Sequence, residues 1–325
     1  EASAIALCIR KAVEDNKSMS LITPDKYLTR QVTAALGRWN LIPDNSAGQP
    51  LSSTPPGIFL RQVCNLIGHK VTAEHLIPLL KNPLTNTGAQ LRGEHLNHVR
   101  ELEITLRNGS GGYLPILRFL KTKIDENKSK NNKILWADWV YKLFKDIETL
   151  KTGSLNSFAK NLIDLSENLS NGPSGQQGSL WEKNSGEIAK KILDSLMSAG
   201  KKKYITTSIE FKTIITSILS KEKVRETTNA HPLIKIWGTI DARATSTEIT
   251  ILGSMNDGIW PPITRIDPWL SRSMRKEAGL LSPERKIGLV AHDFQQGISS
   301  AQVIISRRKR LNDTPAIPAR WLNRI

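Results

Sequence analysis

Short runs of β-branched and apolar residues near both ends of the chain predict strands. The clearest run, residues 249–252, leads into a turn at Gly253 and a second turn at 256–258, followed by Trp260 and two prolines. Similar runs cover residues 20–23, 233–237 and 302–306. Because turn residues follow these runs, we expect short buried strands that deliver polar loops to one edge of a sheet.

Apolar residues spaced every three or four positions predict helices in the rest of the chain. This spacing covers residues 1–13, 25–39, 55–67, 72–81, 134–150 and 283–296. From about residue 81 to 225 the pattern is mostly helical, with polar or glycine-rich breaks. We therefore expect an α/β domain interrupted by a mainly α-helical insertion, divided into residues 1–68, 69–228 and 229–325.

Composition narrows the class of protein. No run approaches the roughly 18 apolar residues that cross a membrane, and residues 1–13 have the pattern of an amphipathic helix, not of a signal peptide. Cys8 and Cys64 lie in helical patterns with no metal-binding spacing and no obvious disulfide framework, so we expect a reducing cytoplasm. The chain lacks an initial methionine, which suggests a piece of a longer protein.

The 325 residues carry a formal net charge of +16, and a surface this basic attracts polyanions such as nucleic acids. The run Arg307, Arg308, Lys309 and Arg310 directly follows a predicted strand, and guanidinium groups suit phosphate oxygens. The alternative is a solvated sheet edge protected by charge. A second basic run, Lys201, Lys202 and Lys203, is a DNA-contact candidate or an exposed helix end.

Aromatic residues gather near the same strands. Trp237 and Trp269 are expected to be buried, whereas Trp260 lies in a loop and is the best candidate to stack on a base of single-stranded DNA. Asn256 lies in the adjoining turn and is a further candidate for contact with DNA. His95 and His98 share one helical face without further metal ligands nearby, which favours a solvated surface over a metal site.

Three segments carry a resemblance to a known family. Residues 249–262 resemble the strand and loop that follow motif V in UvrD-like helicases. Three segments, residues 21–39, 44–57 and 236–294, make the chain similar to the second helicase-like domain of the AddB family, of the alphaproteobacterial type. AddB is the non-translocating subunit of the AddAB helicase–nuclease, which resects DNA double-strand breaks for recombination. The resemblance implies a RecA-like domain with a parallel sheet, as in P-loop helicases.

In active relatives, motifs IV, V and VI place cations against the γ-phosphate of ATP and a carboxylate on its ribose. The matching positions in this chain are degenerate: they carry Pro24 and Asp25, Arg243 to Ser246, and Asp293 with Phe294. Arg285 is a possible substitute cation. The resemblance therefore implies a helicase fold without helicase chemistry. The alternative is half of an active ATP-dependent site, completed by a missing first domain.

The resemblance also implies partners and cofactors. We expect single-stranded and duplex DNA and an AddA-type motor subunit as partners, in the cytoplasm near the nucleoid, with ATP hydrolysed by the motor. The iron–sulfur cluster and nuclease metal of the family belong to a C-terminal domain that this sequence does not contain, and the phosphate-loop pattern of a first helicase domain does not occur in it. A third interpretation is a scaffold whose charge only increases solubility.

Overall fold

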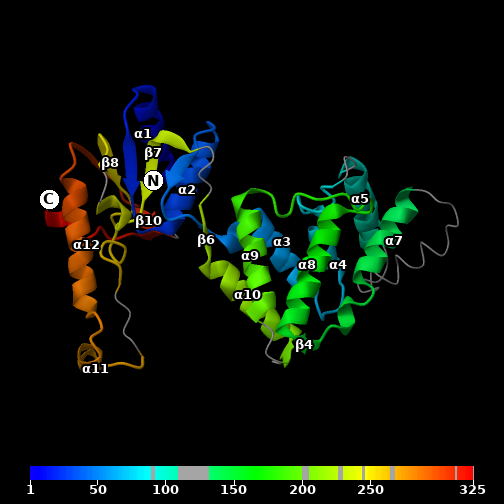
Figure 1. The fold of residues 1–325 in the computed structure, drawn as a ribbon. Coiled ribbons are helices and arrows are strands. Elements are labelled where there is room, and N and C mark those ends of the chain that lie inside the picture. Colours follow the sequence, from blue (N-terminus) through cyan, green and yellow to red (C-terminus); the bar gives the residue numbers. More distant parts are fainter. Residues whose placement is uncertain are drawn as a thin grey trace. The chain divides into compact units, whose positions relative to one another are not determined.

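The computed structural model describes residues 1–88, 92–108, 132–199, 205–225, 230–243, 246–263, 268–311 and 313–324. The chain forms two compact units, each with its own core. Unit 1 comprises Glu1–Gly48 and Arg225–Ile325, and unit 2 comprises Gln49–Val224. An α/β unit is thus interrupted by a mainly helical one, as the sequence predicts (Figure 1).

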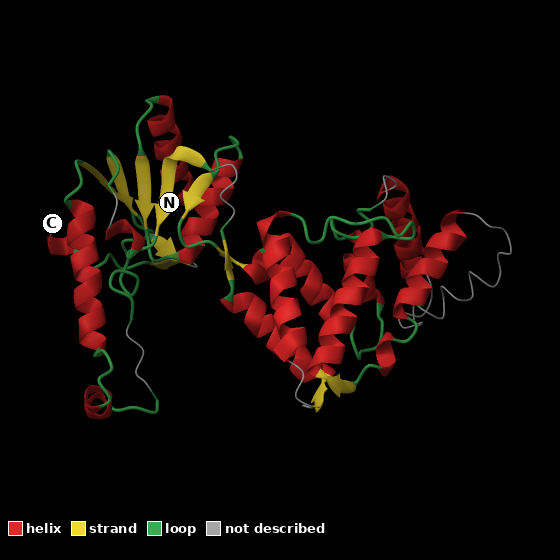
Figure 2. Cartoon of the chain, in the orientation of Figure 1, coloured by secondary structure: helices red, strands yellow, loops and turns green. Residues whose placement is uncertain are grey.

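A five-stranded parallel sheet forms the framework of unit 1 (Figure 2). Its order is β2-β7-β1-β8-β9, with β1 in the centre. The strands are β1 (Met19–Ile22), β2 (Pro43–Asn45), β7 (His231–Trp237), β8 (Ile249–Leu252) and β9 (Gln302–Ile305). Every residue of β1 and β8 is buried, as expected for a parallel sheet covered on both faces.

Alternate strand residues enter two separate cores. On one face, Leu21 and Ile251 pack with residues of α1 (Ala2–Glu14) and α2 (Lys26–Gly37). On the other face, Ile22 and Leu252 pack with Phe294 of α12 (Pro283–Ile298). Figure 1 shows α2 and α12 on opposite sides of the sheet. The strand period of two therefore corresponds to two buried apolar faces.

The connections in the sheet run in opposite directions. From β1 the chain passes through α2 to β2 on one side, whereas from β8 it passes through α12 to β9 on the other. The loops after β1 and β8 therefore lie where the strand order reverses. In open parallel sheets, ligands bind at the carboxyl ends of the strands at such a point.

Shorter elements complete unit 1. They are η3 (Asp241–Arg243), α11 (Arg272–Glu277), the antiparallel pair β10 (Arg310–Leu311) and β11 (Thr314–Pro315), and η4 (Leu322–Arg324).

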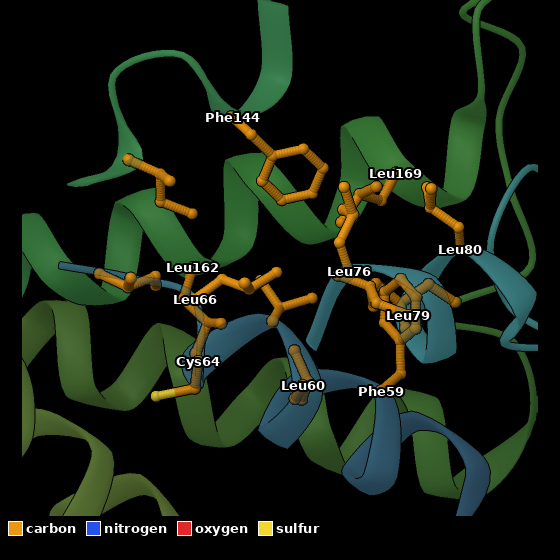
Figure 3. Close-up of a cluster of buried hydrophobic side chains, with 14 of the residues drawn as sticks. Phe59, Leu60, Cys64, Leu66, Leu76, Leu79, Leu80, Phe144, Leu162 and Leu169 are labelled. Carbon is orange, nitrogen blue, oxygen red and sulfur yellow. The ribbon is translucent and has the colours of Figure 1, made fainter. Parts of the chain in front are cut away.

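Unit 2 is a helical unit with a large apolar core. The described helices are α3 (Pro55–Cys64), α4 (Ala73–Lys81), α5 (Arg92–Asn108), α7 (Asn132–Phe144), α8 (Leu155–Asn171), α9 (Lys183–Ala199) and α10 (Ser208–Lys221), with short turns η1 (Leu51–Ser53) and η2 (Ile147–Thr149). Figure 3 shows part of this core, which includes Phe59 and Leu60 of α3, Leu76 of α4 and Phe144 of α7. None of the helices in the described residues is long and apolar enough to span a bilayer.

The units divide the chain at different positions from those expected. The sequence predicts α3 as part of the α/β domain, but Phe59, Leu60 and Val63 are buried in the core of unit 2. The insertion begins and ends at paired strands, β3 (Gln49–Pro50) and β6 (Lys223–Val224). A second small pair in unit 2 joins β4 (Thr152–Ser154) to β5 (Ile205–Thr207).

Candidate nucleic-acid interface

Arg308 joins three loops at the carboxyl edge of the sheet in unit 1. Its guanidinium donates to the carboxylate of Asp25, and its Nη2 lies 3.3 Å from Ser254 Oγ. Its Nε lies 3.5 Å from Glu1 Oε2. We call Glu1, Asp25, Ser254 and Arg308 the Arg308 cluster. Only 16% of the Arg308 side chain and 5% of the Glu1 side chain are exposed, so the ion pairs are largely desolvated.

Asp25 holds the start of α2 and the β9 loop with one carboxylate. Its Oδ1 accepts the backbone N–H of Tyr27 at 2.9 Å, which makes Asp25 the N-cap of α2. Its Oδ2 accepts the hydroxyl of Ser254 at 2.8 Å and the guanidinium of Arg308. The position that the resemblance assigns to a degenerate motif IV is therefore structural, and the adjoining Pro24 is half-buried.

Asn256 also ties loops together. Its Nδ2 donates to the carbonyls of Arg308 at 2.9 Å and Ile317 at 3.2 Å, while its Oδ1 accepts the N–H of Arg308 at 3.0 Å. The side chain is buried, so it presents no free amide to a ligand in this structure. Its expected contact with DNA is replaced by a role in holding the β9 loop.

Trp260 does not form a stacking platform in this structure, contrary to the expectation from its place in a loop. The side chain is 0% exposed, and its Nε1 donates to the carbonyl of Gly253 at 3.0 Å. Its ring meets Phe294 edge-on at a centroid distance of 6.2 Å. The loop folds back onto the sheet, and the indole fills the core beneath α12 instead of facing solvent.

The basic run after β9 is only partly exposed. Arg307 is half-buried and donates to the carbonyl of Arg308 at 3.4 Å, whereas Lys309 and Arg310 are exposed. Arg310 begins β10 and pairs with Pro315. The second basic run, Lys201 to Lys203, lies outside the described residues. The exposed cations near this edge include Lys309 and Arg310, together with Lys26 and Arg30 of α2.

Arg243 and Asp293, from the positions matched to motifs V and VI, bind each other. Arg243 Nε donates to Asp293 Oδ1 at 2.6 Å and Nη2 donates to Oδ2 at 3.0 Å. The hydrogen bonds to Asp293 raise the pKa of Arg243 above its ordinary value. Gln296 Nε2 adds a hydrogen bond to the carbonyl of Arg243 at 2.8 Å, so this arginine is held against α12.

The remaining nucleotide-site positions are dispersed. Phe294 is buried between Trp260 and Trp321, with a centroid distance of 5.2 Å to Trp321. Arg285 and Ser246 are exposed, and Arg285 lies in the first turn of α12. The structure thus brings Arg243 and Asp293 together but leaves Phe294 in the core.

The other aromatic and histidine positions singled out by the sequence agree only in part with their expected burial. Trp237 is buried as expected, but Trp269 is 87% exposed, contrary to expectation.

His95 is buried in unit 2, where Nε2 lies 2.7 Å from the carbonyl of Leu80 and Nδ1 accepts a hydrogen bond from Trp136 Nε1 at 2.9 Å. It therefore lies in the core, not on the solvated surface expected. Within the described ranges, no three His, Cys, Asp or Glu side chains form a group suited to a metal ion.

Comparison with known proteins gives relatives without an assigned function. No family model matches the chain. An uncharacterized protein of Rickettsia felis is 25% identical over 325 residues, covering 98% of this chain and 34% of that protein. An uncharacterized protein of Rickettsia conorii is 22% identical over 309 residues, covering 94% of this chain and 33% of that protein. The chain thus spans about a third of the length of these relatives.

Proposed function

We propose that this chain is a DNA-binding, non-motor region of a larger protein, with a RecA-like α/β domain of the P-loop helicase class. The proposal follows the resemblance to AddB-type subunits of helicase–nucleases that resect double-strand breaks. The parallel sheet and its helical insertion are compatible with that class. In the intact protein, this region would guide DNA and dock an AddA-type motor subunit.

The observation that carries the proposal is the position of the exposed cations. Lys309 and Arg310 follow β9 at the carboxyl edge of the sheet, and Lys26 and Arg30 lie on α2, which begins at the same edge. The connected loops meet at the Arg308 cluster. Cations on two neighbouring elements suit the phosphates of a strand, and the net charge of +16 adds long-range attraction.

A catalytic role in ATP hydrolysis has less support. A γ-phosphate needs an arginine that is free to reach it, but Arg243 is engaged by Asp293. Phe294, which the resemblance matches to the arginine finger of active helicases, is buried and carries no charge. We therefore favour binding over catalysis for this region.

The proposal is tested by titrating fluorescein-labelled single-stranded and duplex oligonucleotides with the full chain and recording fluorescence anisotropy. A DNA-binding region gives saturable binding of micromolar or tighter affinity at low salt. A scaffold whose charge only increases solubility gives no saturable binding to either form.

A further inference from the structure

Tyr27 is an exposed aromatic residue at the carboxyl edge of the sheet that the sequence patterns do not single out. It lies in the first turn of α2, two residues after the N-cap Asp25, and the residue is 60% exposed. The loop after β1 that leads into α2 lies at the point where the strand order reverses. An aromatic ring at a ligand-binding edge presents a face that can stack on another ring.

Arg308 holds the ring of Tyr27 from one side. Its guanidinium carbon lies 5.6 Å from the ring centroid, within the range of a cation–π contact. The same guanidinium is fixed by Asp25 and Ser254, and its Nε lies near Glu1. Because Arg308 is held by three other groups, it restrains the ring while most of the tyrosine remains exposed. A restrained ring loses less rotamer entropy when a ligand binds.

Cations flank this ring on both elements. Lys26 precedes Tyr27, and Arg30 lies three residues later, on the same side of the helix. Lys309 follows Arg308 in the β9 loop and is exposed. The two carboxylates of the Arg308 cluster are turned towards Arg308 and are mostly buried. An exposed ring with nearby cations suits a chain that alternates flat bases with phosphates.

We propose that Tyr27, backed by Arg308, is a base-stacking site for single-stranded DNA. This inference rests on the proposed DNA-binding function and names the form of DNA recognised at this edge. In a duplex, base faces are covered by neighbouring base pairs, so the ring finds no open face along the helix. Cations contribute to binding of both forms, whereas the ring contributes only to the single-stranded form.

The test compares the full chain with Tyr27→Ala, using labelled oligothymidylate and a blunt duplex of the same length. Loss of one stacked base is expected to weaken binding to the single strand by about five- to a hundredfold. Binding to the duplex is expected to stay within about twofold, and the salt dependence of single-strand binding is expected to stay unchanged because no charge is lost. Tyr27→Phe is expected to retain single-strand affinity because it keeps the ring.

Trp269→Ala is the matched control, because Trp269 is also a highly exposed aromatic residue but lies before α11, outside the loops that carry the Arg308 cluster. It is expected to leave both affinities unchanged. Far-UV circular dichroism and the Tm of each variant establish that the fold is kept. If Tyr27→Ala unfolds, photo-crosslinking of the wild-type chain to 5-iododeoxyuridine DNA replaces it, with Tyr27 in the crosslinked peptide as the expected result.

The stacking site is overturned if Tyr27→Ala binds the single strand as well as the wild type, or if it loses both forms equally. In those cases the wild-type chain still binds DNA, so the proposed function survives. A crosslinked peptide without Tyr27 also overturns the site. If the wild-type chain binds neither form, the proposed function fails and the stacking site fails with it.

Discussion

Arg243 and Asp293 form a two-pronged ion pair, with N–O distances of 2.6 and 3.0 Å, between residues 50 positions apart in the chain. Asp293 is almost completely buried, with 2% of its side chain exposed. The pair fixes η3 to α12 with two parallel hydrogen bonds, a geometry that guanidinium and carboxylate groups favour. Positions that the resemblance associates with nucleotide chemistry therefore stabilise the fold.

Replacing Asp293 with alanine is predicted to lower the Tm of the full chain by several degrees. The substitution leaves the donors of Arg243 without their acceptors beside a buried site, and removal of one partner from such a pair is strongly destabilising. Differential scanning fluorimetry measures the shift. Gln295→Ala is the control, because Gln295 is exposed on the same helix and its replacement is expected to leave the Tm unchanged. Equal Tm values for Asp293→Ala and the wild type would contradict this account of the pair.

Trp260→Ala is predicted to destabilise unit 1 by about 3–5 kcal/mol, the usual cost of truncating a buried large aromatic residue. The indole is fully buried, and its removal also leaves the carbonyl of Gly253 without its donor. Urea unfolding followed by circular dichroism measures the change. Trp269→Ala, at an 87% exposed position, is expected to have a much smaller effect. A loss of DNA affinity with unchanged stability would instead restore the stacking role for Trp260.

Reversing the charges of Lys309 and Arg310 to glutamate is predicted to weaken binding to both forms of DNA and to reduce the salt dependence. Both side chains are exposed, and each phosphate contact adds about one unit to the slope of log K against log salt. The control reverses Lys160 and Lys212, two exposed lysines of unit 2, with the same change in net charge. Equal losses in the two double variants would mean that total charge, not this edge, governs binding.

His95 is predicted to make unit 2 less stable as the pH falls. Burial lowers its pKa below the ordinary value of 6.5, because the charged form is desolvated. The unfolded chain then binds a proton that the folded chain does not, so the contribution is present above about pH 6.5 and is lost as the pH falls towards the folded-state pKa. The slope from one such group is at most about 1.4 kcal/mol per pH unit.

Urea unfolding from pH 7.5 to 5 measures this dependence. His95→Gln is the matched variant, because its amide offers both a donor for Leu80 and an acceptor for Trp136 but does not titrate in this range. A smaller slope in His95→Gln than in the wild type is the expected result. Identical slopes would show that His95 does not cause the pH dependence.

Much of the architecture follows from local patterns. The strands near residues 20, 235, 250 and 303 and the helix at 283–298 lie within a few residues of their expected positions, because strong periodicity reports burial directly. In α7, however, two apolar stripes compete. Trp136 and Val140 are buried, whereas Leu135 is 55% exposed, and only tertiary packing selects between these faces.

The candidate site was harder to predict because its contacts join distant segments. Arg308 and Asp25 are 283 positions apart, and no local sequence pattern near either residue predicts that they form an ion pair. Trp260 follows a turn that brings the chain back to the sheet. The loop has no periodic pattern of apolar residues, so the sequence does not predict that Trp260 is buried. No sequence pattern distinguishes Tyr27, because its exposure and its contact with Arg308 exist only in the folded chain.

The salt dependence of DNA binding tests the central claim most directly. The measurement is anisotropy of labelled single-stranded and duplex DNA titrated with the full chain at several salt concentrations between about 50 and 200 mM. A DNA-guiding region predicts saturable binding that weakens steeply and linearly in a plot of log K against log salt. No saturable binding at the lowest salt, or binding that does not change with salt, would contradict the account.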